Sequence, residues 1–566
     1  MKPARSGCFL LLCAALAWAA PPRPQARRSF DLVILHGQVI DGSGKPAYPA
    51  DIGIRGGRIA AIGRLAGAKA RRTLDAHGLA VAPGFFDMHS HSDAALLKNG
   101  GCCSKIFEGV TTEVLGETTA VAVAGPLFGP ALAQQTALFG NEGVDVDWTS
   151  LGGYFARLER QGIRVNVASY ATFGAIRQAV LGMADRDPTA AELAREERLM
   201  AGAMRDGALG LATGFSYTPD IFAKDAEVIA LARVAARAGG IYASHVRGLD
   251  NPKEGGIAEG IAIARAAGLP FHVFHLQVGR RAGPEAASQA LAIIQQARDA
   301  GLEVTADAYP YRAAANPAYS MVPKRFLAGG TAALAKRLRD PALRPQIVAG
   351  IAASARALGT PEDPEGWREE YVSAVTQPED RRYVGLTFEQ VGALDRRPPA
   401  EAIANLLERE GGSFGRIFFN KSAASVRQIV ATPWVSVGGD AIDMDIADRT
   451  GYDAPHPRFF GANTRILVWA RAEHLFSLPE AVRKMTSLAA QTLHIKDRGL
   501  LKPGYAADVV IFDPQTVQDH ATYANPWRYS SGVEDVLVNG VPILLNGRLT
   551  EARPGRVLRG SGYRAR

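Results

Sequence analysis

Apolar runs of strand length alternate with longer helical patterns through the middle of the chain. Between Gly84 and about Ile495, eight short apolar segments are separated by stretches in which apolar residues recur with helical spacing. The eight segments span residues 85–91, 110–117, 166–172, 208–215, 241–247, 271–277, 303–311 and 435–440. Repeated strand–helix units build parallel sheets that are covered by helices. Eight such units predict an α/β fold of the (β/α)8 barrel type, with an active site at the carboxyl ends of the strands.

The two ends of the chain have a different pattern from the middle. Residues 30–83 and 496–566 are rich in short β-type runs that are broken by glycine. The turn pairs Asn539-Gly540 and Asn546-Gly547 follow two of the C-terminal runs. These ends predict the hairpins of a small sheet, and residues 84–495 are left as the barrel domain.

One connection in the predicted barrel is far longer than the others. It lies between the seventh and eighth predicted strands, and we expect an inserted subdomain at about residues 312–432, with a helix of its own at 399–410. After the eighth strand, Ser477 and Glu480 have the spacing of a capping box, which predicts the start of the last barrel helix.

The first twenty residues have the pattern of a secretory signal peptide. Lys2 and Arg5 precede an apolar run, and Ala17 and Ala19 supply small residues at the spacing that a signal peptidase requires. The run is too short to span a bilayer as a helix, so we expect no permanent membrane anchor. We therefore predict a signal peptide at residues 1–19 and an exported, periplasmic or secreted chain that begins near Ala20.

Composition and charge narrow the class of protein. The 566 residues are 47% hydrophobic and 21% charged, which is typical of a globular protein and excludes coiled coil and collagen. Lys and Arg number 64 against 56 Asp and Glu, and the two signs are mixed along most of the chain. Within the basic stretches 337–344 and 553–566 only Tyr563 is aromatic, so we expect no nucleic-acid partner.

Histidine and carboxylate residues follow several of the predicted strands. His89 and His91 end the first strand, and because strand side chains alternate between faces, both point the same way, together with Asp87. Similar positions end the second, fifth, sixth and eighth strands, with Glu117, His245, His275 and Asp440. Neutral imidazole and carboxylate together are ligands that Zn²⁺ or another divalent ion accepts. His272 is an odd number of residues from His275 and is expected on the opposite face.

Several longer motifs resemble the D-aminoacylases, the N-acyl-D-amino-acid deacylases of the metal-dependent amidohydrolase superfamily. The motifs run in family order and span residues 83–91, 109–117, 213–219, 242–247, 307–311, 456–458 and 501–508. The general resemblance extends from about Phe30 to Leu558. It implies a distorted (β/α)8 TIM-like barrel with a small β-sandwich formed by both chain ends. It also implies that one or two zinc ions are held by His89, His91, His245, His275 and Asp440.

Two positions depart from the family pattern. Some relatives have a cysteine where this chain has Thr118, so we assign the role of bridging metal ligand to Glu117; the alternative is that Glu117 pairs with Arg247. A carboxylate in place of a thiolate permits divalent ions other than zinc. The second departure is Gln277, where the family commonly has a lysine that can meet a substrate carboxylate; Arg280 or Arg281 are candidates to compensate for it.

Four residues form the predicted substrate site. Arg458 is the first candidate to grip a substrate carboxylate, because a guanidinium group offers two parallel hydrogen bonds; the alternative is pairing with a structural carboxylate. Tyr309 is placed to donate to the substrate carbonyl oxygen, or else packs in the barrel. Gln277 and Arg247 complete the set.

The resemblance implies hydrolysis of the amide bond of N-acyl-D-amino acids, a small-molecule reaction that releases a carboxylate and a free D-amino acid. Asp440 is expected to take a proton from water and pass it to the leaving nitrogen. The alternatives are a cyclic amide hydrolase of the dihydroorotase or hydantoinase kind, an isoaspartyl-type dipeptidase with the same metal site, and a catalytically silent barrel that serves as a scaffold. The sequence does not indicate an oligomeric state.

Overall fold

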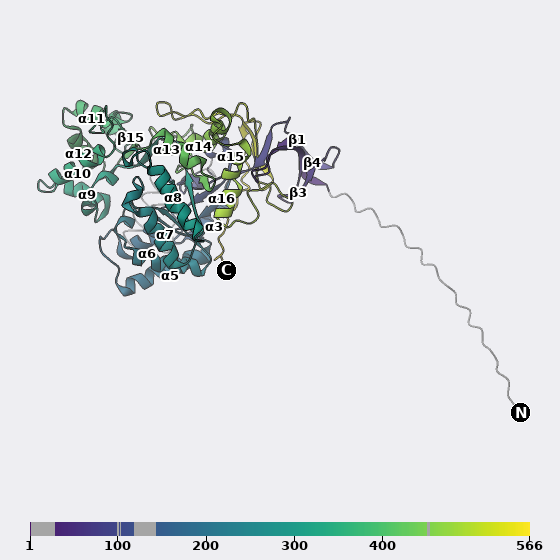
Figure 1. Ribbon diagram of the computed structural model, residues 1–566, viewed down its shortest axis with the longest axis horizontal. Coiled ribbons are helices and arrows are strands. Elements are labelled where there is room, and N and C mark those ends of the chain that lie inside the picture. The colour runs from purple at the N-terminus through teal and green to yellow at the C-terminus, as the bar shows by residue number, and fades with distance from the viewer. Residues whose placement is uncertain (2–28, 99–100, 102, 118–142, 450–452, 566) are drawn as a thin grey trace.

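The computed structural model describes the chain apart from residues 2–28, 99–100, 102, 118–142, 450–452 and 566. The predicted signal peptide therefore lies outside the described residues. The fold that follows has three parts: a barrel, a β-sandwich and an inserted lobe, with the last two toward opposite ends of the molecule in Figure 1. Within the described residues, no helix combines the length and apolar character needed to cross a membrane.

The predicted eight-stranded barrel is confirmed, with shorter strands than the sequence suggests. Its strands are β6 Phe85–Asp87, β7 Val110–Leu115, β8 Asn166–Ser169 with its continuation β9 Ala171–Thr172, β10 Gly210–Gly214, β11 Ile241–His245, β12 Phe271–Val273, β13 Val304–Ala308 and β17 Val435–Val437. One parallel sheet has the order β6-β7-β8 and the other has the order β9-β10-β11-β12-β13-β17. Tyr170 joins the sheets on one side. On the other side the backbone N–H of Met88 donates to Val437 O at 3.2 Å, so a distorted barrel results.

Helices pack outside the barrel strands. They are α1 Ser104–Phe107, α3 Leu151–Gln161, α4 Phe173–Leu181, α5 Ala190–Asp206, α6 Asp225–Arg237, α7 Gly256–Ala267, α8 Ala286–Asp299, α13 Ala423–Ala431, α14 Arg458–Val468, α15 Leu478–Met485 and α16 Ser487–Thr492. Buried side chains such as Leu231, Ile263 and Ile294 join the helices to the strands in one large core. The last predicted barrel helix is α15, and Ser477 caps it by accepting a hydrogen bond from the Glu480 N–H.

Both ends of the chain contribute to one nine-stranded sheet that folds into the β-sandwich. The strands are β1 Phe30–Val39, β2 Tyr48–Arg55, β3 Arg58–Gly63, β4 Ala70–Asp75, β5 Ala80–Pro83, β18 Val509–Phe512, β19 Val533–Val538, β20 Val541–Leu545 and β21 Arg548–Leu549. β5 pairs antiparallel with β18, which joins the N-terminal strands to the C-terminal ones. Ile34, Ile52 and Ile511 are among the buried residues of its core.

The C-terminal segment after β21 leaves the sandwich and returns to the barrel. Val167 N donates to Arg556 O at 2.9 Å, and Leu558 N donates to Val167 O at 2.7 Å. Residues near 557 therefore lie along β8, although the sequence pattern had grouped them with the terminal sheet.

The long connection after β13 forms a lobe with its own core. Its sheet has the order β14-β16-β15, with bounds Ala313–Pro317, Gly415–Phe419 and Glu370–Ala374. Its helices are α9 Gly330–Leu338, α10 Arg344–Arg356, α11 Phe388–Asp395 and α12 Pro399–Arg409, the last of which matches the helix predicted from the sequence. Figure 1 shows these helices gathered at one end of the molecule. α13 packs on α8 and β17, so the chain has already returned to the barrel there.

Candidate metal centre

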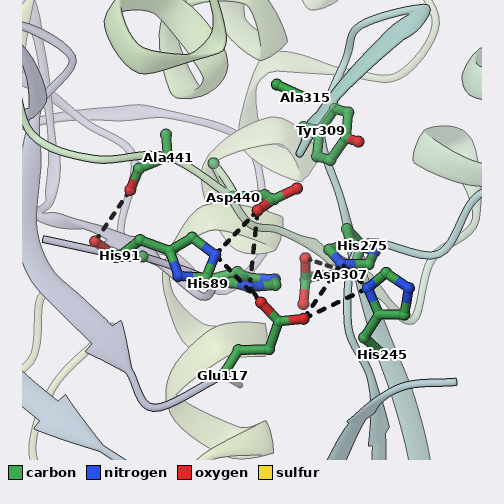
Figure 2. Close-up of polar contacts among 12 residues, drawn as sticks. His89, His91, Glu117, His245, His275, Asp307, Tyr309, Ala315, Asp440 and Ala441 are labelled. Carbon is green, nitrogen blue, oxygen red and sulfur yellow. Dashed lines mark hydrogen bonds and ion pairs between the residues drawn. The ribbon is translucent and has the colours of Figure 1, made fainter. Parts of the chain in front are cut away.

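His89 and His91 lie just after β6, where the chain has left the strand. The Nε2 atoms of both rings are 3.2 Å from Glu117 Oε2. Asp440, just after β17, places its Oδ1 atom 3.2 Å from His91 Nε2 and 3.9 Å from His89 Nε2. One imidazole pair and two carboxylates thus converge on one point, as Figure 2 shows.

A second group of donors lies on the other side of Glu117. His245 Nδ1 is 3.4 Å and His275 Nε2 is 3.9 Å from Glu117 Oε1, and the two nitrogens are 3.1 Å apart. Figure 2 shows the Glu117 carboxylate between the two groups, with one oxygen directed to each. Glu117 therefore has the position of a bridging ligand. Arg247 pairs with Glu259 at 2.9 Å, so the alternative in which it neutralises Glu117 is not what the structure shows.

This donor set fits divalent metal ions. Glu117 Oε1 is buried and has no hydrogen-bond partner, which is unfavourable for a carboxylate unless a cation is near. In each group the donor atoms lie within 4.8 Å of one another. Imidazole nitrogen and carboxylate oxygen are the ligands that Zn²⁺ and similar ions take.

The pKa values of the ligands reflect their mutual charges. Burial alone would raise the pKa of Glu117, but the charge of His89 and the nearby imidazoles of His245 and His275 hold it well below its usual range. Burial alone would lower the pKa of His91, but hydrogen bonds to Asp440 and Glu117 raise it to about 10. Without a metal ion, the carboxylates thus hold a proton on His91, and a bound cation has to displace that proton.

Two of the candidate ligands have backbone conformations that few residues adopt. His275 has φ 32° and Asp440 has φ 47°, both in the left-handed region. Hydrogen bonds hold these conformations: Asp307 Oδ1 accepts from the His275 N–H at 3.0 Å, and His89 O accepts from the Asp440 N–H at 2.7 Å. Asp307 Oδ2 in turn lies 2.9 Å from His272 Nε2, so His272 fixes the carboxylate that holds the backbone of His275.

A buried polar network fixes the segment that carries His89 and His91. Ser90 and Ser92 both donate to Glu113 Oε2, at 2.5 and 2.6 Å. Asp87, which strand alternation grouped with the two histidines, instead forms an ion pair with the buried Lys105 and accepts from the Gly439 N–H at 2.6 Å. Asp87 therefore holds the ends of β6 and β17 together and is not among the grouped metal donors.

Arg458, the first candidate to bind a substrate carboxylate, lies beside Asp440 and Tyr309. Its Nη1 atom is 3.0 Å from Asp440 Oδ2, and its guanidinium carbon lies 4.7 Å from the centre of the Tyr309 ring. Nε is buried without a hydrogen-bond partner. Arg458 thus has an unpaired donor beside the metal centre, while its Nη1 atom faces Asp440.

The other three predicted substrate residues differ in position. The Tyr309 hydroxyl donates to Gln277 Oε1 at 3.2 Å, so these two side chains lie together near His275. Arg247 points elsewhere: it bonds Glu259 and the Ile221 and Ala223 carbonyls and stacks on Phe215. Arg247 is therefore not part of the proposed substrate site, because its guanidinium donors already bond other groups of the protein.

Sequence reasoning missed Lys421. Its Nζ atom donates to Gln277 Oε1 at 2.8 Å and to the Tyr309 oxygen at 3.0 Å. An ammonium group therefore lies beside the glutamine that stands where a lysine is common in the family. Arg280 and Arg281 do not fill this place, because they bond Glu369 and carbonyls of the 358–364 segment. Nothing in the local pattern around Lys421 signals this contact, which joins residues 144 positions apart.

A cavity of about 600 Å³ opens beside the first donor group. The barrel contributes His91, Glu117, Tyr217, Asp440 and Arg458 to its lining. The inserted lobe contributes residues of β14, β15 and β16, among them Asn316, Ser373 and Arg416. This volume suits a small molecule, and the lobe forms one wall of the cavity.

The chain combines a barrel and a β-sandwich with two groups of metal donors at the carboxyl ends of the barrel strands. This combination is typical of metal-dependent hydrolases, and the comparison of sequences leads to the same class. The sequence profile of the amidohydrolase family matches residues 72–544, so the chain belongs to that family. Within it, the chain belongs with the N-acyl-D-amino-acid deacylases, the D-aminoacylase family that the sequence motifs resemble.

Two relatives and one solved structure support this placement. The chain is 34% identical over 534 residues to the N-acyl-D-glutamate deacylase of Alcaligenes xylosoxydans xylosoxydans, with 94% of this chain and 97% of the relative covered. It is 32% identical over 530 residues to the D-aminoacylase of the same organism, with coverages of 94% and 97%. The crystal structure of N-acyl-D-glutamate deacylase from Bordetella bronchiseptica, complexed with zinc and a phosphonate inhibitor, matches with a TM-score of 0.76 and 30% identity, over 94% of this chain and 100% of that one.

Proposed function

We propose that this protein hydrolyses the amide bond of N-acyl-D-amino acids and releases a carboxylate and a free D-amino acid. The observation that carries the proposal is the pair of donor groups that share Glu117, in a chain whose relatives are deacylases of this kind. The buried guanidinium group of Arg458 beside these groups, with its Nε atom unpaired, suits a substrate that ends in a carboxylate.

The proposed metal ligands are His89, His91, Glu117 and Asp440 for one ion, and Glu117, His245 and His275 for a second. Zinc is the proposed ion, because the donors are imidazole and carboxylate and because a solved relative is complexed with zinc. A bound divalent ion would lower the pKa of a water molecule to about 7 and polarise the scissile carbonyl. The carboxylate bridge is compatible with ions other than zinc.

Asp440 is proposed to accept the proton of the attacking water and deliver it to the leaving nitrogen. Burial alone would raise the pKa of Asp440, but the Arg458 cation and the neighbouring histidines hold it below its usual range. The carboxylate therefore stays ionised, which leaves its oxygens unprotonated before the reaction.

Arg458 is proposed to bind the substrate carboxylate. Its guanidinium group is buried, rests on the Tyr309 ring and lines the cavity. A carboxylate bound there lies beside Asp440, so the amide bond next to it is close to the proton acceptor. Binding of this kind fixes the orientation of a chiral amino acid and supports a preference for one enantiomer.

The experiment that tests the function is an activity screen with metal-reconstituted protein. We expect free amino acid to be released from N-acetyl-D-amino acids and not from the L-enantiomers, hydantoins, dihydroorotate or isoaspartyl dipeptides. Cleavage of a cyclic amide or an isoaspartyl bond instead would replace this proposal by the corresponding alternative. Protein that binds no Zn²⁺, Co²⁺ or Mn²⁺ would favour the silent scaffold.

We also propose that the protein is exported after cleavage near Ala19. The proposal rests on the charged and apolar pattern of the first residues, which lie outside the described part of the chain. Sequencing the N-terminus of the protein from its native host is the test, and a chain that begins with Met1 would contradict the proposal.

A further inference from the structure

Lys421 is a buried amine without a counter-ion. It follows β16, is only 2% exposed, and donates to two neutral oxygens, Gln277 Oε1 and the Tyr309 hydroxyl. Among the described residues, no carboxylate lies within ion-pair distance of its ammonium group. Burying a charge in this way is unfavourable, and burial together with the Arg458 cation lowers the pKa of Lys421 to about 7. Such a position indicates a role in binding or chemistry.

The hydrogen bonds among Lys421, Gln277 and Tyr309 allow the Tyr309 hydroxyl to change its acceptor. Gln277 Oε1 accepts from both Tyr309 and Lys421, at 3.2 and 2.8 Å, while the Tyr309 oxygen accepts from Lys421 at 3.0 Å. Gln277 Nε2 donates to Asp250 Oδ1 at 3.0 Å, which fixes the amide with its oxygen toward Tyr309. If the single proton of the Tyr309 hydroxyl turns away, Gln277 Oε1 keeps the Lys421 bond. No buried acceptor is then left unpaired.

The Tyr309 ring lies near both this set and the metal centre. Its ring centre is 6.3 Å from that of His275, and Arg458 and Lys421 lie 4.7 and 4.4 Å from the ring. We infer that Lys421 is a positioning residue for Tyr309. Its ammonium group keeps its hydrogen bonds to Gln277 Oε1 and to the phenol oxygen, while the Tyr309 hydroxyl turns its proton to the negatively charged oxygen that forms on the scissile carbonyl. The inference rests on the proposed amide hydrolysis.

The electrostatic reason is that a cation donating to the phenol oxygen makes the phenol proton a stronger donor. A donor directed at the oxygen where charge develops stabilises the transition state more than the substrate. Loss of Lys421 should therefore lower kcat and leave KM nearly unchanged. If Lys421 bound the substrate carboxylate directly, its loss would raise KM instead.

The test compares K421M, Y309F and the double variant in metal-loaded protein with an N-acetyl-D-amino acid that the wild type cleaves. Methionine keeps the length of the side chain and removes the charge. We expect kcat to fall by about 10- to 100-fold in K421M, with KM within about twofold of the wild type. The double variant should be no slower than Y309F alone, because Lys421 acts through Tyr309. Unchanged kcat, a raised KM, or effects that multiply in the double variant would each overturn the inference.

Controls separate positioning from damage to the fold. Lys324 is half-exposed and 3.9 Å from Asp185, so K324M should match the wild type in every measurement. Metal content and thermal unfolding are measured for each variant, and K421R, which keeps the charge, should recover part of the kcat lost in K421M. If K421M does not fold, K421Q replaces it as the neutral variant, and a kcat of K421Q equal to that of the wild type would overturn the inference.

A readout without turnover separates this inference from the proposed function. Protein labelled with 3-fluorotyrosine is observed by ¹⁹F NMR, and Y309F identifies the resonance of Tyr309. The resonance should move in K421M and stay in place in K324M; no movement in K421M would contradict the inference. Wild-type protein that cleaves no N-acyl-D-amino acid would defeat the proposed function, while the NMR result would still show whether Lys421 sets the state of Tyr309.

Discussion

Asp440 combines an unusual backbone conformation with several strong contacts. Its φ of 47° is held by a hydrogen bond to His89 O, and its two carboxylate oxygens face His91 and Arg458 separately. Asparagine tolerates the left-handed region well and has nearly the same size. Exchange of Asp440 for Asn therefore removes the charge and leaves the local geometry.

In D440N we expect turnover to fall by about 10²- to 10⁴-fold, because the amide cannot accept the proton of water. The five other candidate ligands remain, so metal content measured by elemental analysis should be largely retained. Retained activity would show that another group accepts the proton.

Asp307 gives a second prediction, which concerns metal affinity. Its Oδ1 atom holds the His275 backbone and its Oδ2 atom holds His272. D307N keeps one acceptor and loses the charge, so His275 should be held less firmly and metal affinity should fall by about 10- to 100-fold. Competition with a chelator measures the affinity. An unchanged affinity would mean that β12 and β13 alone position His275.

The sequence predicted which residues converge in the candidate metal centre better than it predicted the contacts of the candidate substrate residues. Histidines and carboxylates after apolar runs can be placed because parallel strands end at one edge of a barrel. Arg247 also follows an apolar run, yet its guanidinium turns to Glu259 on α7. Lys421 could not be found, because its contact with Gln277 depends on how the inserted lobe returns to the barrel.

At the scale of elements, the inserted sheet depends on one buried ion pair. Arg416 on β16 and Glu370 on β15 pair directly, and Arg416 is 5% exposed while Glu370 is fully buried. Removing one partner leaves an uncompensated buried charge.

R416M should therefore lower the free energy of unfolding of the lobe by about 3–5 kcal/mol. Arg339 forms an exposed pair with Glu408 at 3.1 Å, so R339M is a matched control that should cost at most about 1 kcal/mol. Denaturant unfolding followed by tryptophan fluorescence, with Trp367 packed against the lobe core, is the measurement. Equal effects of the two substitutions would contradict the argument.

The strands themselves were predictable, but their ends were not. Apolar runs identified all eight barrel strands because these strands are buried on both faces. The runs continue past the last ladder hydrogen bond, as at β12, which ends at Val273 although the apolar pattern reaches Gln277. The turn at His275 has a positive φ, and no feature of the sequence requires it there.

At the scale of the whole molecule, buried ionisable groups predict how stability changes with pH. Burial raises the pKa of Glu108 to about 8 and that of Asp443 to about 7, and carboxylates raise that of His91 to about 10. In each case the folded protein keeps a proton that the unfolded chain releases. Stability is therefore fully present below the unfolded pKa values and is lost as pH rises through the folded ones.

We expect the Tm of the metal-free protein to fall between about pH 5 and pH 9. E108Q, which cannot ionise, should flatten part of this slope below pH 8. Scanning calorimetry with a chelator present measures both proteins. A Tm that rises over this range would show that the lowered pKa values of the buried Lys421 and Lys484 dominate, contrary to the expectation.

The pairing of β5 with β18 means that strands from the two ends of the chain are neighbours in one sheet. A copy cut short before Val509 would leave the edge of β5 bare, with hydrogen-bonding groups open to any other extended peptide. Truncated chains should consequently aggregate or be degraded, whereas the full-length chain covers that edge with β18. The sheet therefore cannot be completed until the C-terminal strands have been synthesised.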